Sequence, residues 1–357
     1  MKITSDFPGG NIKVLSIEDK IVRLEQDLKG TADWWFYWCF RVDNPDEGTF
    51  EFTFQNGEVV SAHGPAVSTD GVSWTRRKDC FLSHTRFSYT FTGQEPFVYF
   101  SFAYPYTLSN FDRFCSSIVL QKHFLCKSED GREIPYLTFG NGSQNAFIIA
   151  RHHCCETPAS FVLEGIVSAA LQTPSLLKLF TFHVFPFADL DGTEKGEQGK
   201  GRAPHDHNRD YIDEPLYAFT KAIKVYAREH TPSVYLDLHA PLKWGGTSDA
   251  THLHISESGA CRPDAQDLFV AKLSANAANA VIGYEGVTIP FYPEKTVSSK
   301  YFFAVDCKAT LAVTIETPYS GNREFGYDVA ALYEWGENIA KTLADICTTD
   351  LFSNAGN

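Results

Sequence analysis

The stretch AFIIARHHCCETP, residues 146–158, joins an apolar run to a group of polar side chains and then to the signals of a helix start. Its first five residues predict a buried strand. Thr157 is a preferred N-cap residue, and Pro158 suits the first helical position. A strand that passes directly into a helix is typical of α/β proteins, whose ligand sites form outside the carboxyl ends of the strands. Residues 151–156 are therefore placed where a functional site is expected.

The remainder of the second half repeats this alternation. Strand-like apolar runs and helical patterns follow one another, with strands at 180–185, 233–239 and 310–316 and helices near 158–172, 212–229, 264–280 and 327–347. This order predicts an α/β domain with a mixed, largely parallel sheet flanked by helices. His239 and Glu316 end two of the strands, so we expect them to converge with the polar residues that follow residue 150.

The first hundred residues have a different character. Short aromatic-rich runs at 34–42, 49–54, 86–91 and 97–103 are separated by Gly, Pro, Asp and Asn, with little helical periodicity. Such runs are typical of an antiparallel sandwich or barrel. The pattern changes near 110–125. We therefore predict an N-terminal β-sandwich domain over residues 1–118 and an α/β domain over residues 119–357.

Composition narrows the class of protein. The formal net charge of −13 disfavours nucleic acid and anionic membrane as partners. Nine cysteines, an odd number without tight framework spacing, favour a reducing compartment. The first residues lack the apolar core of a signal peptide, and no apolar run reaches the ~18 residues of a membrane span. These features predict a cytoplasmic protein.

His153, Glu156 and His239 offer two imidazoles and a carboxylate, which together make three zinc ligands and leave a fourth position for water. Alternative interpretations exist for each residue taken alone. The histidines suit structural roles, Glu156 suits a helix cap, and His152 becomes the ligand if the spacing to Glu156 is longer by one. Cys154 and Cys155, which lie between the first two ligands, are interpreted as small loop fillers.

The stretch GRAPHDHNRDY, residues 201–211, adds a clue about the substrate. Arg202, Asn208 and Arg209 beside a metal can hold a carboxylate through charge-assisted hydrogen bonds, which favours a substrate with a free carboxylate. The alternative is a solvated charged loop. The preceding segment, residues 189–200, is acidic and rich in glycine, which predicts a flexible rim.

With these residues in view, the chain resembles the zinc carboxypeptidases, specifically the cytosolic carboxypeptidase branch and its bacterial relatives. Residues 150–157 are similar to the first zinc motif of that branch, with Cys154-Cys155 in place of the usual Pro-Gly. The segments at 35–37, 71–74 and 103–107 resemble the β-sandwich that precedes the peptidase domain in this branch. The resemblance spans nearly the whole chain.

The resemblance implies a role for each site residue. His153, Glu156 and His239 would bind one zinc ion per chain, with Asp206 orienting the first histidine. The catalytic pair would be Glu316 as general base and Arg202 as the group that polarises the scissile carbonyl. Substrate-binding roles would go to Asn208 and Arg209, which hold the terminal carboxylate, to a mobile tyrosine at Tyr292 or Tyr301, and to Lys300.

Lys300 bears on specificity. A lysine in the pocket for the terminal side chain would favour Glu or Asp, because an acidic group offers a partner to a buried cation. A one-residue slip of the match would place Tyr301 there instead and make the pocket apolar.

The predicted function is that of a zinc metallocarboxypeptidase that removes C-terminal residues from peptides or protein tails, with a preference for acidic residues. Two alternatives stay open. One is a zinc amidohydrolase acting on a carboxylate-bearing amide, such as a cell-wall stem peptide or an N-acyl amino acid. The other is a zinc-binding module without catalysis.

Overall fold

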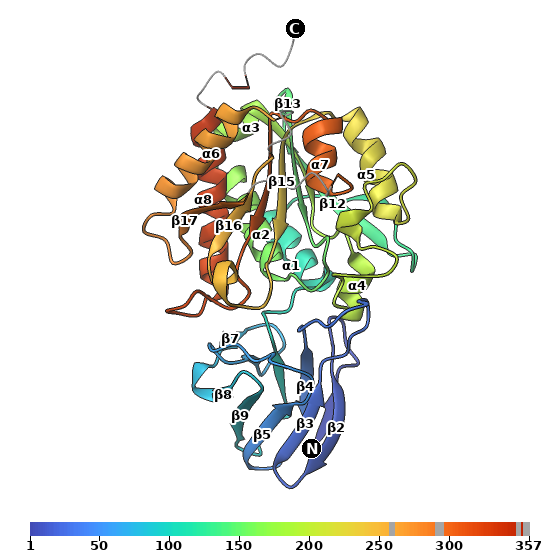
Figure 1. Ribbon diagram of the computed structural model, residues 1–357, viewed down its shortest axis with the longest axis vertical. Coiled ribbons are helices and arrows are strands. Elements are labelled where there is room, and N and C mark those ends of the chain that lie inside the picture. Colours follow the sequence, from blue (N-terminus) through green and yellow to red (C-terminus); the bar gives the residue numbers. More distant parts are fainter. Residues whose placement is uncertain (257–260, 290–295, 348–350, 353–357) are drawn as a thin grey trace.

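The computed structural model describes residues 1–256, 261–289, 296–347 and 351–352. Two units are stacked along the long axis of the molecule, with the N-terminal β unit below the α/β unit in Figure 1. Among the helices of the described residues, none is both long enough and apolar enough to cross a membrane.

The N-terminal unit consists of two five-stranded sheets, ordered β1-β4-β10-β6-β7 and β2-β3-β5-β9-β8. Neighbouring strands run antiparallel except β3 and β5, which pair in parallel. The predicted β-sandwich is confirmed, with this one parallel pair. The strands are β1 Lys2–Thr4, β2 Lys13–Glu18, β3 Ile21–Glu25, β4 Cys39–Asp43, β5 Gly48–Phe54, β6 Ala66–Ser68, β7 Thr75–Arg76, β8 Phe81–Ser83, β9 Arg86–Phe91 and β10 Phe97–Ser101, with the short helix η1 at Lys78–Cys80.

Alternating aromatic residues build the core of the sandwich. In β5 every second residue, Phe50, Phe52 and Phe54, is buried, as expected for a strand with one face on a core. The ring of Phe52 stacks on Phe87 of β9 with centroids 4.8 Å apart. Burial of each such side chain stabilises the fold by roughly 1.5–3 kcal/mol, so this domain has a core of its own.

The second unit contains an eight-stranded sheet of order β11-β12-β14-β13-β15-β18-β16-β17. Its centre, from β14 through β13 and β15 to β18, is parallel. Strands β12 and β16 join this centre in the antiparallel sense. The predicted mixed sheet is therefore confirmed. Its strands are β11 His123–Lys127, β12 Glu133–Gly140, β13 Gln144–Ala150, β14 Phe180–Phe185, β15 Pro232–His239, β16 Thr251–His254, β17 Tyr284–Ile289 and β18 Leu311–Glu316.

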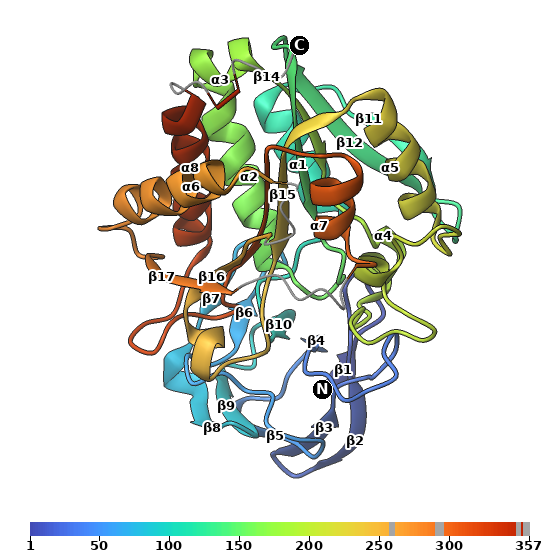
Figure 2. The same ribbon diagram turned by 45° about the horizontal axis from the view of Figure 1, so that its top comes forward.

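Helices cover both faces of this sheet. Figures 1 and 2 show α3, α6 and α8 on one side and α5 and α7 on the other. The helices are α1 Leu108–Ile118, α2 Pro158–Leu171, α3 Pro174–Leu179, α4 Leu190–Lys195, α5 Ala218–Glu229, α6 Pro263–Asn276, α7 Ser299–Tyr301 and α8 Val329–Cys347, with short turns η2 His207–Arg209, η3 Gly246–Asp249 and the π-helical η5 Phe302–Asp306. Helix α2 packs closely against α8, because Gly165 and Gly336 lie where the two helices cross.

Helix α1 belongs to the second unit by its packing. Phe111, Phe114 and Cys115 join the core cluster formed by the α/β sheet and its helices. The last sandwich strand ends at Ser101. We therefore propose that the boundary lies between residues 101 and 108 rather than at residue 118.

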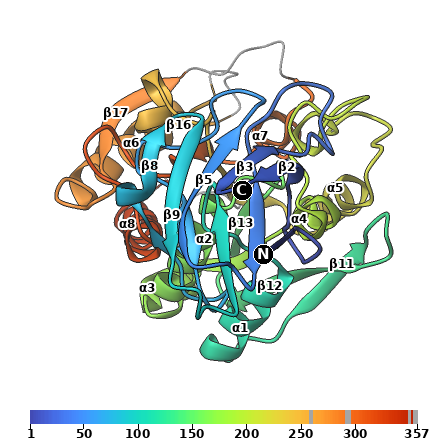
Figure 3. The ribbon, with the colours of Figure 1, turned by 90° about the horizontal axis from the view of Figure 1, so that it is seen from below.

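The sandwich packs against the carboxyl end of the central sheet, and Figure 3 shows its strands in front of the α/β unit. Tyr37 of the sandwich clusters with Cys155 in the turn after β13. The rings of Phe36 and Phe102 lie 5.3 and 5.4 Å from that of Tyr319, which follows β18. This seam places the first domain beside the expected functional site.

Candidate metal and peptidase site

Three side chains from separate elements meet beyond the carboxyl ends of β13 and β15. His153 and Glu156 lie in the turn between β13 and α2, and His239 is the last residue of β15. One oxygen of Glu156 is 2.7 Å from Nδ1 of His153, and the other is 2.7 Å from Nδ1 of His239. All three side chains are buried, and one ligand atom from each lies within 4.8 Å of the others.

Carboxylates lie behind both rings. Nε2 of His153 is 3.6 Å from Asp206, and Nε2 of His239 is 3.1 Å from Asp237. Burial alone would lower the pKa of His239, but Asp237 and Glu156 raise it well above its ordinary value. In metal sites such carboxylates fix the orientation of the ligating ring. Asp237 was missed from sequence, although its place two residues before His239 puts both side chains on one face of β15.

This donor set fits a divalent ion such as zinc. Two imidazoles and a carboxylate, supported from behind, are the chemistry of catalytic zinc sites. The alternative ligand His152 has Nδ1 2.9 Å from Asp237 and Nε2 2.9 Å from the hydroxyl of Tyr211. Because both of its ring nitrogens are engaged in the core, the geometry favours His153.

Arg151, which was not predicted, shapes the turn that carries two of these side chains. Its φ is +62°, an uncommon value for a residue with a side chain. Its buried guanidinium donates to the carbonyls of Cys154 and Tyr106 and to the hydroxyl of Ser160. These bonds hold the backbone conformation in place. Thr157 does precede the first residue of α2, but its hydroxyl makes no capping bond, because its own backbone is already helical.

Glu316 lies beside this group. It ends β18 opposite His239 of β15, and its Oε2 is buried without a hydrogen bond among the described residues. On the other side, antiparallel β16 places His252 opposite Glu316, and Nε2 of His254 is 3.7 Å from its Oε1. These two histidines were not predicted. The alternation His-Leu-His indicates that both share one face of a strand.

Asn208 and Arg209 come from η2, next to the metal-ligand candidates. Asn208 Oδ1 accepts hydrogen bonds from the backbone N and Oγ of Ser299, and its Nδ2 is 3.2 Å from Nε2 of His239. Arg209 donates from Nη1 to the carbonyl of Asn208. Within the described part of the chain, no carboxylate forms a close ion pair with Arg209, so its charge is available to a ligand.

Arg202 is engaged differently. Its guanidinium donates to Asp189 at 2.6 Å and to Glu197 at 2.7 Å. Lys200, two residues earlier, instead has its Nζ 3.8 Å from Oε1 of Glu156. Burial would lower the pKa of Lys200, but Glu156 and other carboxylates of the site raise it. The structure therefore brings Lys200, and not Arg202, next to the metal-ligand candidates.

The expectation of a flexible rim at residues 189–200 was wrong. The segment contains α4, which Asp189 caps by accepting a hydrogen bond from the backbone N of Gly192. Asp191 is buried and accepts hydrogen bonds from the hydroxyl of Ser128 and the backbone N of Asp130. Acidic and glycine residues here serve capping and close packing, which composition does not distinguish from solvent exposure.

The predicted specificity residues are only partly described. Lys300 is buried in α7 and donates from Nζ to the carbonyl of Ile255 at 3.0 Å. Tyr301 follows it and is half-buried. Tyr292 lies outside the described residues.

Cys154 and Cys155 are buried free thiols. Burial, together with the nearby Glu156 carboxylate, raises the pKa of Cys155 to about 12. A thiol must ionise to act as a nucleophile, so this environment suits a packing role.

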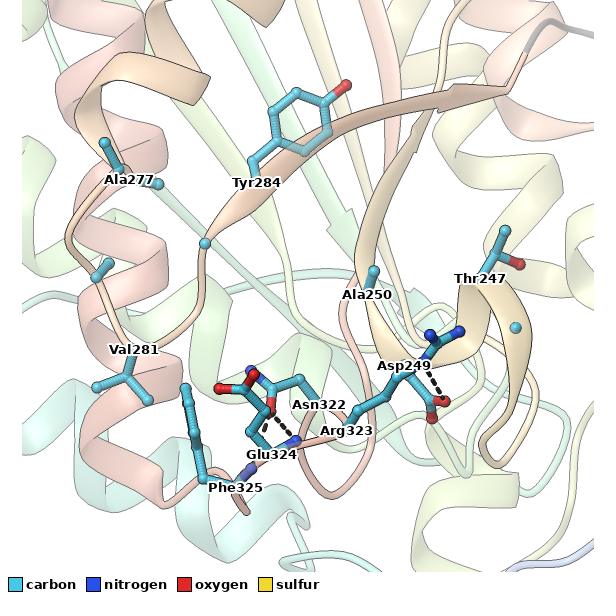
Figure 4. Close-up of a pocket in the computed structure, with 14 residues that line it drawn as sticks. Thr247, Asp249, Ala250, Ala277, Val281, Tyr284, Asn322, Arg323, Glu324 and Phe325 are labelled. Atoms are coloured by element: carbon cyan, nitrogen blue, oxygen red, sulfur yellow. Dashed lines mark hydrogen bonds and ion pairs between the residues drawn. The ribbon is translucent and has the colours of Figure 1, made fainter.

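A separate pocket of about 730 Å³ contains none of the predicted site residues. Figure 4 shows Thr247, Asp249 and Ala250 on one side and Asn322 to Phe325 below, with Tyr284 above. Two of its lining residues, Arg323 and Asp249, form an ion pair at 3.6 Å.

The sequence is similar to those of several known proteins. Residues 3–103 match the model of the cytosolic carboxypeptidase N-terminal domain. An uncharacterised protein of Zymomonas mobilis, ZMO1242, is 25% identical over 60% of this chain and 60% of its own length. Cytosolic carboxypeptidase 2 of Xenopus tropicalis is 24% identical over 98% of this chain but only 42% of its own length. This chain thus spans less than two thirds of these relatives.

Solved structures share the fold across nearly the full length. A metallo-carboxypeptidase from Burkholderia cenocepacia gives a TM-score of 0.84 at 17% identity, over 96% of this chain and 98% of its own. A metallo-carboxypeptidase from Pseudomonas aeruginosa, solved with (2-guanidinoethylmercapto)succinic acid, gives 0.82 at 20% identity, over 97% and 99%. Residues 3–103 thus match the N-terminal domain of the cytosolic carboxypeptidases, and the chain as a whole has the fold of these two metallo-carboxypeptidases.

Proposed function

We propose that this protein is a zinc-dependent metallocarboxypeptidase that removes C-terminal residues from peptides or protein tails. The observation that carries the proposal is the convergence of His153, Glu156 and His239 next to a carboxylate, Glu316, whose buried Oε2 has no partner among the described residues. An acceptor left without a donor in a buried site suits a group that takes up a proton during the reaction.

His153, Glu156 and His239 would hold the zinc ion, which would supply the Lewis acidity that this reaction needs. Glu316 takes the proton from the attacking water as the new carbon–oxygen bond forms. It then passes that proton to the amine nitrogen as the peptide bond breaks. Asp206 and Asp237 hold the two histidine rings in orientation throughout.

The terminal carboxylate of the substrate is assigned to Arg209. A guanidinium binds a carboxylate through two parallel hydrogen bonds, and among the described residues no carboxylate forms an ion pair with Arg209. Asn208 supports this position through its bonds to Ser299 and its contact with His239. Such a site selects chains that end in a free carboxylate.

We further propose a preference for acidic terminal residues, carried by the buried ammonium of Lys300. Lys300→Met should lower kcat/KM for peptides ending in Glu by about 10-fold or more, because the charge pair is lost. Peptides ending in Leu should be affected much less. Kinetics on matched peptides that differ only in the last residue measure this ratio, and an unchanged Glu-to-Leu ratio would remove Lys300 from specificity.

The decisive test is mass spectrometry of zinc-loaded protein with peptides varied at the last residue. We expect stepwise loss of terminal residues. Glu316→Gln should retain zinc and lose activity, whereas His239→Ala should lose both, as metal analysis will show. Equal zinc loss in the two variants contradicts the division of roles.

Failure to cleave any peptide would favour one of the two alternatives. Hydrolysis of a stem peptide or an N-acyl amino acid would identify an amidohydrolase. Zinc binding without turnover of any of these amides would identify a binding module.

We also propose a reducing, cytoplasmic setting and no nucleic-acid or membrane partner. All nine cysteines are free thiols, and the net charge is −13. Neither feature suits an oxidising compartment or a polyanionic surface.

A further inference from the structure

Two cations of one loop, Lys200 and Arg202, have different partners. Arg202 is bound to two carboxylates, and one of them, Asp189, is buried and accepts a further hydrogen bond from Gly192. Turning Arg202 toward the metal-ligand candidates would leave that buried carboxylate without its cation, which is strongly unfavourable. Lys200 need not leave a buried partner in order to reach the site, because the carboxylate next to its ammonium is Glu156, one of the metal-ligand candidates.

The loop that carries Lys200 has a fixed backbone. Gly199 has a φ of +81°, and a Cβ there would lie 2.6 Å from the backbone N of Cys154, so no other residue fits. The backbone N of Gly199 donates to the carbonyl of Gly30, and that of Ala32 donates to the carbonyl of Gly201. Lys200 thus lies between two points where the loop is bonded to the sandwich domain.

A side chain of the loop itself also bonds to the sandwich domain. Gln198 is fully buried, accepts a hydrogen bond from the backbone N of Tyr37 and donates to the carbonyls of Tyr37 and Asp27. The ammonium of Lys200 lies 5.5 Å from the ring centre of Trp35, a cation–π contact that directs it along the seam. The sandwich therefore determines where this charge lies.

We propose that Lys200 is a catalytic residue, whose ammonium binds the scissile carbonyl oxygen and stabilises the negative charge that develops there, and that Arg202 has a structural role as the partner of Asp189 and Glu197. This proposal rests on the peptidase function proposed above. A fixed cation aimed at developing oxyanion charge is a major source of catalysis in acyl transfer. Lys200 places a compact positive charge at the site, whereas the planar guanidinium of Arg202 is already hydrogen-bonded to two carboxylates.

The test compares Lys200→Met with Lys195→Met in zinc-loaded protein. Lys195 lies in the same segment and pairs with Asp130, so its substitution removes the same charge outside the site. We expect Lys200→Met to lower kcat about 100-fold or more with little change in KM, and Lys195→Met to leave both near the wild-type values. Lys200→Arg should restore part of the loss.

A second measurement does not depend on turnover. Calorimetric titration compares a tripeptide phosphonate, whose tetrahedral oxygens resemble the transition state, with the amino-acid product. Lys200→Met should weaken phosphonate binding about 100-fold and leave product binding and zinc content unchanged. Arg202→Met should lower thermal stability and keep the phosphonate-to-product affinity ratio of the wild type.

The outcomes are distinct. Loss of phosphonate selectivity in Arg202→Met but not in Lys200→Met overturns the assignment in favour of the arginine. Altered zinc content in Lys200→Met with an unchanged phosphonate-to-product ratio shows that Lys200 only balances the charge of Glu156, which also overturns it. If wild-type protein cleaves no peptide and binds no phosphonate, the proposed function fails, and the role of Lys200 fails with it.

Discussion

Glu164 is a buried carboxyl group whose partner is the hydroxyl of Tyr106, not a cation. Burial raises the pKa of Glu164 to about 7, against an ordinary value of 4.5. Folding therefore takes up a proton between these values, so stability falls as pH rises through this window and stays low above it. Glu164→Gln should raise the free energy of unfolding at about pH 8 by up to about 3 kcal/mol, and by less near pH 5.

Urea unfolding of both proteins at the two pH values measures this difference. If Glu164→Gln raises the free energy of unfolding equally at both pH values, ionisation of Glu164 does not affect the stability of the wild type. The hydrogen bond from Tyr106 is kept in the variant, because a Gln carbonyl also accepts.

At the residue scale, sequence could indicate the groups that lie at strand ends. His153, His239 and Glu316 each follow an apolar run, and parallel strands bring their carboxyl ends together. The partners of Arg202 could not be predicted, because they depend on how the loop around Lys200 bonds to residues 29–32, which are distant in sequence. Local sequence carries no information on such pairing.

Helix α2 and helix α8 approach so closely that neither has room for a side chain at the crossing. A Cβ on Gly336 would lie 2.2 Å from the carbonyl of Val162, and one on Gly165 would lie 2.3 Å from the carbonyl of Tyr333. Both obstacles are backbone atoms, so only a helix shift can make space. Gly336→Ala should destabilise the protein by about 1–3 kcal/mol despite the better helix propensity of Ala.

Thermal unfolding measures this loss, with Gly283→Ala as the control. Gly283 meets only one backbone oxygen, at 3.7 Å, which is an ordinary contact distance. Equal stability of Gly336→Ala and wild type would mean that the helices separate without cost.

The apolar patterns predicted the parallel centre of the larger sheet and the sandwich strands β4, β5, β9 and β10, but they missed the other strands of both units. Some predicted strands were also longer than the observed ones. Residues 34–42 were expected as one strand, whereas β4 begins only at Cys39. The backbone of Trp35 and Tyr37 bonds instead to the side chains of Gln26 and Gln198. A run of aromatic residues indicates that the segment is buried. It does not reveal whether the backbone of the segment forms hydrogen bonds with a neighbouring strand or with side-chain amides.

At the scale of the whole molecule, the two domains share apolar surface. Ala240 and Tyr319 of the α/β unit belong to the core cluster of the sandwich. Deleting residues 1–115 should therefore give insoluble protein, because these side chains would become exposed. The apolar side chains of the α/β core that pack against α1 would become exposed as well. Expression of this fragment beside the full chain tests this, and a soluble, fully active fragment contradicts it.

The backbone bonds between residues 29–32 and 198–201 also bear on how the protein loses its structure. When hydrogen bonds cross from one domain into a buried loop of the other, neither domain can open without releasing its neighbour, so both should behave as one cooperative unit. Differential scanning calorimetry should then give a single heat-absorption peak, with tryptophan emission and zinc retention changing at the same temperature. Two resolved peaks would mean that the seam opens before either core melts.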